Sequence, residues 1–182
     1  MGKLIMWNLV TLDGYFEGPN HDISWFSDVW GEELEKVSIE QLDTAGALLF
    51  GRVTYELMAA HWPKETGVVA DAMNALPKFV FSRTHRESDW NNTRFPAGDA
   101  VAEVARLKRE MPKDIFVFGS ADLSASFMSA GLLDEIRLCV TPHLLGSGTR
   151  LFRDAPERQK LALIDARALS VGGVILRYRP GA

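Results

Sequence analysis

The sequence contains little cysteine and histidine. Among its 182 residues there is one cysteine, Cys139, which lies in an apolar run and reads as a reduced core residue. One thiol cannot form an internal disulfide, and a chain of this length can bury a sufficient core without one, so we expect a reducing, cytoplasmic location. No metal site is expected, because no spacing typical of metal ligands relates the four histidines, His21, His61, His85 and His143.

Positive charge and long apolar runs are also scarce. The chain has 20 lysines and arginines against 24 acidic residues, a formal net charge of −4 at pH 7. Non-specific binding to nucleic acid needs clustered basic residues, so it is not expected. The apolar run at residues 3–10 is ended by Thr11, Asp13 and Glu17, well short of the roughly 20 residues of a membrane-spanning helix. We therefore expect neither a membrane nor a nucleic acid as a partner, and no signal peptide.

Two familiar enzyme signatures are missing as well. The Gly-x-Gly-x-x-Gly fingerprint is absent, which disfavours an ordinary Rossmann site. No Ser–His–Asp or Cys–His set can be assembled, which disfavours hydrolysis through a covalent intermediate. The sequence instead shows apolar segments typical of strands, alternating with segments of helical periodicity. The expected strands are residues 3–10, 47–50, 78–82, 92–95, 114–119 and 134–142, and the expected helices are residues 25–45, 52–62, 67–76, 98–111 and 120–132.

The C-terminal residues 160–180 differ from this alternation. They read as two strands joined near Gly172 and Gly173, with no helix between them. Alternating strands and helices followed by strands alone predict an α/β fold with a mostly parallel central sheet, helices on both faces and an antiparallel C-terminal edge. Because we find no repeat, low-complexity tract or linker, we expect one domain over residues 1–182.

Three of the predicted strands end in ways that suggest a ligand. The segments are "LLFGRVTYE" (48–56), "KFVFSRTHR" (78–86) and "VFGSADLSASF" (117–127). In open α/β sheets, ligands bind beyond the carboxyl ends of strands, where helix N-termini present free N–H groups. Each turn alone is common in proteins. Three on one sheet, two of them with arginine, favour one extended anionic ligand such as a dinucleotide.

Several other residues have a plain structural interpretation. Arg52 could be a surface residue, but a cation in the first turn opposes the helix dipole, which favours a ligand contact. The "GSGT" at 146–149 precedes no clear helix and predicts a tight turn. Asp134 and Glu135 predict a solvated strand end. Trp25 is the best candidate to line a pocket. We expect Trp7, Trp30 and Trp62 to lie in the core.

Four segments together resemble the dihydrofolate reductase superfamily. They are "TLDGYFEG", "LLFGRVTYE", "KFVFSRT" and "VFGSADLSASFMSAGLLDEIRLCVTPHLLGSGTRLF". The branch that they resemble contains the reductase domain of the bifunctional riboflavin-pathway deaminase/reductases, and the motif order is kept over nearly the whole chain. The resemblance implies a three-layer α/β/α fold that binds NADPH and is often dimeric. We see no deaminase domain with zinc-binding residues, so we expect a stand-alone member.

The resemblance also implies cofactor contacts at four places. The end of the first strand, which borders the nicotinamide, is matched by Val10 and Thr11. The turn that contacts the cofactor phosphates is matched by Gly51, Arg52 and Thr54. The strand end around the adenosine 2′-phosphate is matched by Ser82, Arg83 and Thr84. The turn that cradles the pyrophosphate is matched by Gly119, Ser120, Asp122 and Leu123, with Gly-Ser in place of the family's Gly-Gly.

A substrate site is implied next to the first strand. Asp13 and Gly14 match a Ser-Leu-Asp-Gly motif near the substrate, with Thr11 in place of serine. We expect Asp13 to be catalytic, orienting the substrate or relaying a proton, and Gly14 and Trp25 to help bind the substrate. The alternative is that Asp13 only shapes its own turn.

The function implied by the resemblance is NADPH-dependent reduction. The substrate would be a small heterocycle, pyrimidine- or pterin-like, as in 5-amino-6-(5-phosphoribosylamino)uracil reductase, and the hydride would go to a C=N or C=O carbon. One alternative is dihydrofolate reduction, for which Asp28 is the nearest acidic candidate. Another is an NADPH-binding sensor without turnover. The resemblance also implies a homodimer, and the C-terminal strands, "LALIDARAL" and "VILRYRP", are the predicted contact surface.

Overall fold

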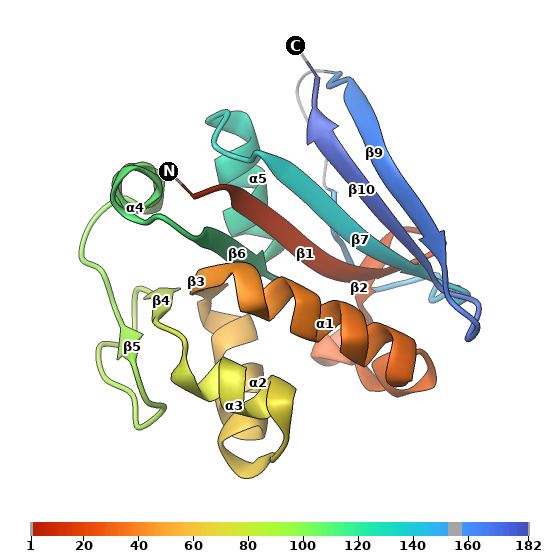
Figure 1. The fold of residues 1–182 in the computed structure, drawn as a ribbon, viewed down its shortest axis with the longest axis horizontal. Coiled ribbons are helices and arrows are strands. Elements are labelled where there is room, and N and C mark those ends of the chain that lie inside the picture. Colours follow the sequence, from red (N-terminus) through yellow and green to blue (C-terminus); the bar gives the residue numbers. More distant parts are fainter. Residues whose placement is uncertain (1, 153–157, 182) are drawn as a thin grey trace.

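In the computed structural model, the described residues are 2–152 and 158–181, and most of their strands form one large sheet. The sheet has eight strands in the order β5-β4-β3-β6-β1-β7-β10-β9 (Figure 1). Its parallel part consists of β1 (Leu4–Thr11), β3 (Ala45–Gly51), β4 (Lys78–Phe81), β5 (Thr93–Arg94), β6 (Asp114–Phe118) and β7 (Glu135–Thr141). Two antiparallel strands complete one edge, β9 (Leu161–Ala168) and β10 (Val174–Pro180). The predicted fold class is confirmed.

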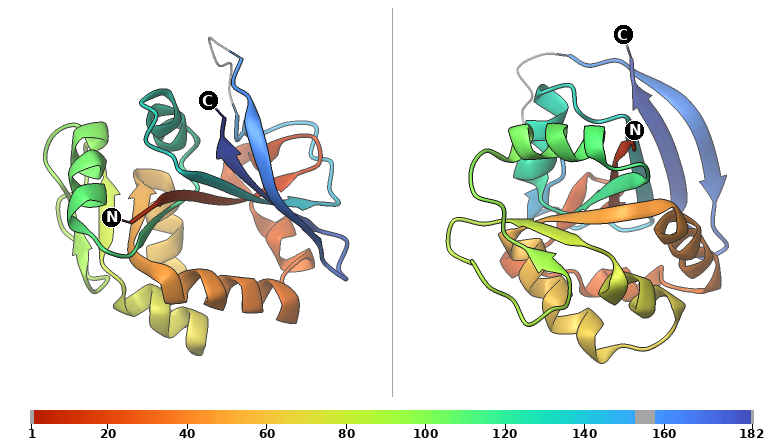
Figure 2. Two further views of the ribbon diagram at one scale, coloured as in Figure 1. Left: turned by 45° about the horizontal axis from the view of Figure 1, so that its top comes forward. Right: turned by 60° about the vertical axis from the view of Figure 1, so that its left-hand side comes forward.

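Helices cover both faces of the sheet (Figure 2). One face packs against α1 (Glu32–Thr44), α2 (Arg52–His61) and α3 (Val68–Ala75), and the other against α4 (Ala100–Glu110) and α5 (Ala121–Ser129). In β1, Ile5 and Trp7 belong to the first core, and Leu4 and Met6 to the second. Both faces of β1 are therefore buried, which is why its sequence is a continuous apolar run. Among the described helices, none combines the length and apolar character that crossing a membrane requires.

Short elements follow some of the strands. The segment predicted as one helix or two is divided at Gly31 into a 3₁₀ turn, η2 (Ser24–Asp28), and α1. Two further 3₁₀ turns are η1 (Pro19–His21) and η3 (Trp62–Lys64). A second, antiparallel sheet joins β2 (Tyr15–Glu17) to β8 (Thr149–Arg150). The sequence prediction treated both segments as loops, because two or three residues show no periodicity and their partner is more than a hundred positions away.

Two predictions about burial were wrong. Trp30 was placed in the core, but it is 47% exposed, since the chain turns at Gly31 directly after it. Glu135 was expected to be solvated, but it is 2% exposed. Its Oε1 accepts hydrogen bonds from Arg137 and Arg177, both at 2.7 Å. These two arginines face each other because β10 pairs with β7, a long-range pairing that the local sequence does not reveal.

Candidate functional site

A cleft of about 810 Å³ crosses the carboxyl ends of β4, β3 and β6. Its volume lies in the range of roughly 300–1,000 Å³ that small-molecule sites occupy. Because these strands are parallel, all three predicted turns reach the same edge of the sheet. Eight of the residues that the resemblance implied for the cofactor line the cleft, namely Gly51, Arg52, Thr54, Ser82, Arg83, Ser120, Asp122 and Leu123. Seven implied residues are not among its lining, namely Val10, Thr11, Asp13, Gly14, Trp25, Thr84 and Gly119.

The turns after β3 and β6 are hydrogen-bonded to each other. The Ser120 hydroxyl oxygen accepts the backbone N–H of Gly51 at 2.7 Å, and Thr54 Oγ1 accepts the backbone N–H of Ser120 at 3.1 Å. The two hydroxyl oxygens also lie 3.1 Å apart. We refer to these contacts as the Thr54–Ser120 bridge. It places the N-termini of α2 and α5 side by side at the middle of the cleft.

The backbone at the second turn is unusual. Gly119 and the non-glycine Ser120 both have left-handed conformations, with φ of 59° and 54°. A Cβ atom at Gly119 would lie 2.5 Å from Thr54 Oγ1, so glycine is required there. Ser120, where the resemblance implied a second glycine, turns its hydroxyl toward Gly51 and the bridge. The serine at this position therefore ties the two turns together.

An arginine-rich loop forms the end of the cleft near β4. The Ser82 hydroxyl accepts the backbone N–H groups of Thr84 and His85, at 3.1 and 2.9 Å. Arg86 donates to the carbonyl oxygens of Ser82, His85 and Arg83, at 2.8, 2.9 and 3.2 Å. Within the part of the chain that the structure describes, no carboxylate is paired with Arg83 or Arg86, and both side chains line the cleft. Sequence reasoning missed Arg86, whose only local signal is its place in a polar loop.

Arg52 differs from these two arginines. Its guanidinium is paired with the Glu56 carboxylate at 3.0 Å, one helical turn along α2. Glu56 also lies 2.7 Å from His85 Nε2, and the hydrogen bonds from His85 and Arg52 hold the pKa of Glu56 below its usual value. The positive charge of Arg52 is thus partly neutralised by Glu56. Arg83 and Arg86 have no carboxylate partner among the described residues, so more of their positive charge is available to an anionic ligand.

Asp13 is engaged with a second loop. Its carboxylate accepts the Thr11 hydroxyl at 2.6 Å and the backbone N–H groups of Leu145 and Gly146 at 3.1 and 2.8 Å. The hydrogen bond from Thr11, followed by that from Gly146, lowers the pKa of Asp13. The carboxylate therefore fastens the loop after β7 to the end of β1. Its catalytic role stays a prediction, and its role in holding the loop is observed.

Trp25 lies under the surface and is not among the residues that line the cleft. It is 6% exposed and packs edge-on against Phe26, with ring centroids 4.5 Å apart, and against His143 at 5.7 Å. Its indole N–H is buried and has no hydrogen-bond partner among the described residues. His143 Nε2 also lies 3.2 Å from Asp28, whose side chain is 65% exposed. The substrate contact expected of Trp25 stays a prediction, and the structure shows a packing role.

The other end of the cleft contains residues that sequence reasoning did not single out. Phe16 and Glu17 from β2, His21 from η1 and Thr149 from β8 line it. Glu17 is 6% exposed, and its carboxylate is held by His21 and Thr149. The local sequence gave no reason to connect these residues, because only the pairing of β2 with β8 brings them together.

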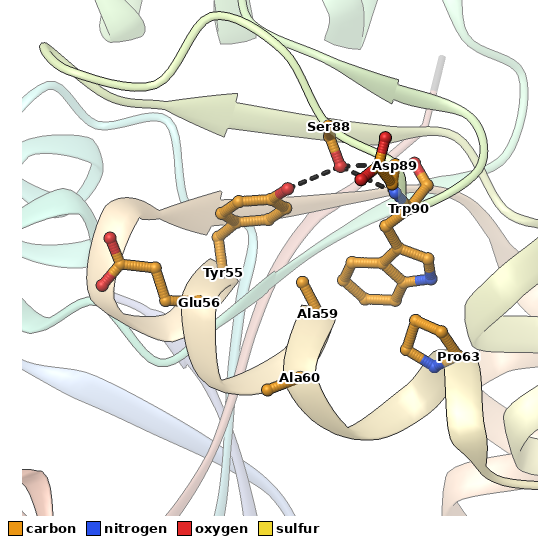
Figure 3. A pocket seen from close by; sticks show the side chains of 8 residues that line it. All are labelled: Tyr55, Glu56, Ala59, Ala60, Pro63, Ser88, Asp89 and Trp90. Atoms are coloured by element: carbon orange, nitrogen blue, oxygen red, sulfur yellow. Dashed lines mark hydrogen bonds between the residues drawn. The ribbon is translucent and has the colours of Figure 1, made fainter.

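A smaller hollow of about 410 Å³ lies beside α2 (Figure 3). Tyr55, Ser88 and Trp90 line it, and the Tyr55 hydroxyl donates to Ser88 Oγ at 2.5 Å. Ser88 Oγ accepts the Trp90 backbone N–H at 2.9 Å. Its polar groups thus satisfy one another, and none of the residues implied for cofactor or substrate lies in it. We therefore place the candidate site in the larger cleft.

Among the described residues, no group of three or more His, Cys, Asp and Glu is arranged to hold a metal ion.

Comparison with known proteins identifies the family. A family model for the RibD C-terminal domain matches residues 2–176. The chain belongs to the RibD C-terminal domain family. It is 33% identical to the uncharacterized protein YyaP of Bacillus subtilis (strain 168), over 97% of this chain and 94% of that protein. It is also 29% identical to YwjB of the same organism, with 88% of each chain covered.

Two solved structures show the same fold. A putative riboflavin biosynthesis protein from Shewanella sp. PV-4 has a TM-score of 0.82 at 19% identity, covering 99% of both chains. The diaminohydroxyphosphoribosylaminopyrimidine deaminase/5-amino-6-(5-phosphoribosylamino)uracil reductase of Thermotoga maritima has a TM-score of 0.71 at 14% identity. That match covers 99% of this chain and 57% of the Thermotoga chain. The RibD-type reductase fold expected from the sequence is confirmed.

Proposed function

We propose that this protein is an NADPH-dependent oxidoreductase that reduces a C=N or C=O bond in a small heterocyclic substrate, pyrimidine-like in the first instance. The observation that carries the proposal is the cleft itself. Loops from three neighbouring parallel strands line it, and the residues matched to the RibD family's cofactor site meet there.

The charges and hydrogen-bond donors of the cleft support NADPH as the cofactor. Arg83 and Arg86 offer two cations at one end, which suits the adenosine 2′-phosphate. The N-termini of α2 and α5 offer backbone N–H groups in the middle, which suits the pyrophosphate. Only one of the two hydroxyl hydrogens can lie between the oxygens of Thr54 and Ser120, so the other hydrogen has no acceptor within the pair. A phosphate oxygen is a suitable acceptor for it.

The chain's own contribution to the reaction is binding and alignment. NADPH, when bound, supplies the hydride. The arginines and helix N-termini hold the anionic groups of the cofactor, and the bridge fixes the two turns before any ligand arrives. Such preorganisation lowers the cost of ordering the site on binding.

A pyrimidine-like substrate is supported by the relatives. The Thermotoga structure of the same fold is named as a 5-amino-6-(5-phosphoribosylamino)uracil reductase. Dihydrofolate reduction is less well supported, because Asp28 is paired with His143 and does not line the cleft. The cytoplasm is the proposed location, since the one thiol, Cys139, is buried, and burial raises its pKa to about 11.

The first experiment measures cofactor binding and turnover separately. NADPH and NADH are titrated by calorimetry, and NADPH oxidation is then followed with 5-amino-6-(5-phosphoribosylamino)uracil and with dihydrofolate as probes. We expect NADPH to bind about ten- to a hundredfold more tightly than NADH, the equivalent of roughly 1.5–3 kcal/mol for charge-assisted contacts to the 2′-phosphate. Failure of both cofactors to bind would overturn the proposal. Binding without turnover of either probe would favour the sensor alternative.

A further inference from the structure

A buried carboxylate lies at the end of the cleft away from the arginines. Glu17 closes β2, is 6% exposed and lines the cleft. Its Oε1 accepts the Thr149 hydroxyl at 2.7 Å and lies 2.9 Å from Nδ1 of His21. Carboxylates are seldom buried without a partner, and the partner here is a titratable ring that also lines the cleft. Neither residue has a role in the function proposed above.

The backbone adopts uncommon conformations around this pair. Asn20 and His21 are both left-handed, with φ of 57° and 60°, although neither is glycine. On the facing loop, Gly148 has a φ of 127°, and a Cβ atom there would lie 2.2 Å from the Glu17 carbonyl oxygen. Non-glycine residues in such conformations cluster at functional sites, where the surrounding structure holds them. The three segments β2, η1 and the loop with Gly148 thus pack against one another at the Glu17 carboxylate and the His21 imidazole.

The strand order indicates which part of a dinucleotide this end would meet. The arginine loop follows β4, and the two helix N-termini follow β3 and β6, the next strands across the sheet. β1 comes next, and β2 folds back against its end, where Thr11 Oγ1 accepts the Tyr15 N–H at 3.0 Å. If Arg83 held the 2′-phosphate of a cofactor and the helix N-termini held its pyrophosphate, the nicotinamide would lie on the side of Glu17 and His21.

We propose that His21 donates the proton in the reduction and that Glu17 positions its ring. This inference rests on the proposed function. Nδ1 of His21 faces Glu17, so Nε2 is the nitrogen left for a substrate. A carboxylate at one ring nitrogen fixes the orientation and the tautomer of the imidazole, which is the arrangement of many catalytic histidines.

The proposed step balances in atoms and electrons. Reduction of a C=N bond adds a hydride, with two electrons, to carbon and one proton to nitrogen. The hydride comes from NADPH, which is thereby oxidised to NADP⁺. The proton comes from Nε2–H of protonated His21, which becomes neutral and keeps Nδ1–H on Glu17. Because the His21 side chain is 54% exposed, water can return the proton after each turnover.

The NMR signals of the His21 ring provide a test that needs no substrate. Oxidation of the cofactor adds one positive charge to the nicotinamide ring, and a nearby charge changes the electrostatic environment of an imidazole. The other charged groups of the cleft and beside the pair are the same in both complexes. They are Asp22 next to His21, Arg150 of β8, which packs on Tyr15, and the cleft residues Arg52, Arg83, Arg86, Asp99 and Asp122. A difference between the two complexes therefore reports how close the nicotinamide lies to His21.

The experiment compares NMR spectra of protein with ¹³C-labelled histidine rings, recorded at one pH for the free protein, with saturating NADPH and with saturating NADP⁺. The His21 signals are assigned with His21→Asn, because asparagine tolerates a left-handed backbone. We expect the His21 ring signals to differ between the two complexes, because they differ by a unit charge within roughly 8 Å of the ring. His85, bonded to Glu56 near the arginine end, is the internal control and should not differ. In free Glu17→Gln protein, the His21 ring signals should also move, because the anionic partner of the ring is gone.

The possible outcomes separate this inference from the proposed function. If the cofactors bind but the ring signals of His21 are the same in both complexes, the inference is wrong and the proposed function stands. If neither cofactor binds, both fail. With any probe that the wild type reduces, His21→Asn should lower kcat by about 10²-fold or more while the Kd of NADPH changes less than threefold. Unchanged kcat would also overturn the role of His21.

Discussion

The hydroxyl oxygens of Thr54 and Ser120 lie 3.1 Å apart, although the two residues are separated by 66 positions in the chain. This contact, with the two backbone hydrogen bonds beside it, holds the N-termini of α2 and α5 together. Helix N-termini carry partial positive charge, so two of them side by side repel each other unless something binds them or lies between them. The Thr54–Ser120 bridge therefore keeps the two helix N-termini together as an anion site in the absence of a ligand.

Thr54→Val tests the bridge because valine keeps the shape of threonine and removes the hydroxyl. The Ser120 N–H would lose its acceptor, and a part-buried donor without a partner costs about 1–3 kcal/mol. We expect the free energy of unfolding in urea to fall by that amount and NADPH to bind more weakly. Thr66→Val, at an exposed threonine, is the matched control and should stay within about 0.5 kcal/mol of wild type. Equal stability of the two variants would show that the bridge is dispensable.

Arg83→Ala and Arg86→Ala test the cofactor's orientation. Both arginines line the cleft without a carboxylate partner among the described residues, so each has charge available for the 2′-phosphate. We expect each change to weaken NADPH binding about tenfold or more, with little effect on NADH, which lacks that phosphate. Calorimetric titration of both cofactors measures this, with Arg109→Ala on the exposed face of α4 as the control. Equal losses for NADPH and NADH would place the 2′-phosphate elsewhere.

These residues illustrate what the sequence could and could not predict. The turns after β3 and β6 were found because a buried strand followed by glycine and then a helix has a local signature, and the turn after β4 because its buried strand ends in serine and arginine. Parallel strands must bring such turns to one edge. Arg86 was missed because its role depends on how a loop folds around its guanidinium. Glu17 and His21 were missed because the pairing of β2 with β8 has no local signature.

A homodimer stays a prediction, and the structure identifies the surface to test. The edge strand β9 exposes two neighbouring apolar residues, Leu163 at 58% and Ile164 at 45%. The pairing of β9 with β10 shifts register at these residues, between Leu163 and Asp165, and exposed apolar edge strands are usually paired or covered. We propose that a second copy covers it.

Light scattering at micromolar concentrations measures the assembly. We expect twice the monomer mass for the wild type and the monomer mass for Leu163→Glu with Ile164→Glu. Val68→Glu, at another exposed apolar residue (59% exposed), is the control and should leave the mass unchanged. A monomeric wild type would contradict the proposal.

The pH dependence of stability separates the two roles of Asp13. Its carboxylate accepts hydrogen bonds from Leu145, Gly146 and Thr11, and the pKa of Asp13 is lowered, first by Thr11. A carboxyl group with a lowered pKa in the folded state stabilises the protein above its unfolded pKa of about 3.9, and this contribution is lost as the pH falls through the folded value. We therefore expect Asp13→Ala to melt below wild type at pH 7, with the difference shrinking as the pH drops below about 4.

Asp13→Asn then distinguishes holding the loop from catalysis. Asparagine keeps an acceptor for the Leu145 and Gly146 N–H groups but cannot relay a proton, so its melting temperature should lie between those of wild type and Asp13→Ala. If Asp13 only fastens the loop, turnover in Asp13→Asn will follow stability and remain near wild type at temperatures where the variant is folded. A fall of about 10²-fold or more in kcat, with the fold and the Kd of NADPH preserved, would instead establish the carboxylate as part of the chemistry. In that case Asp13 would compete with His21 for the role of proton donor, and the double variant would show which of the two the reaction uses.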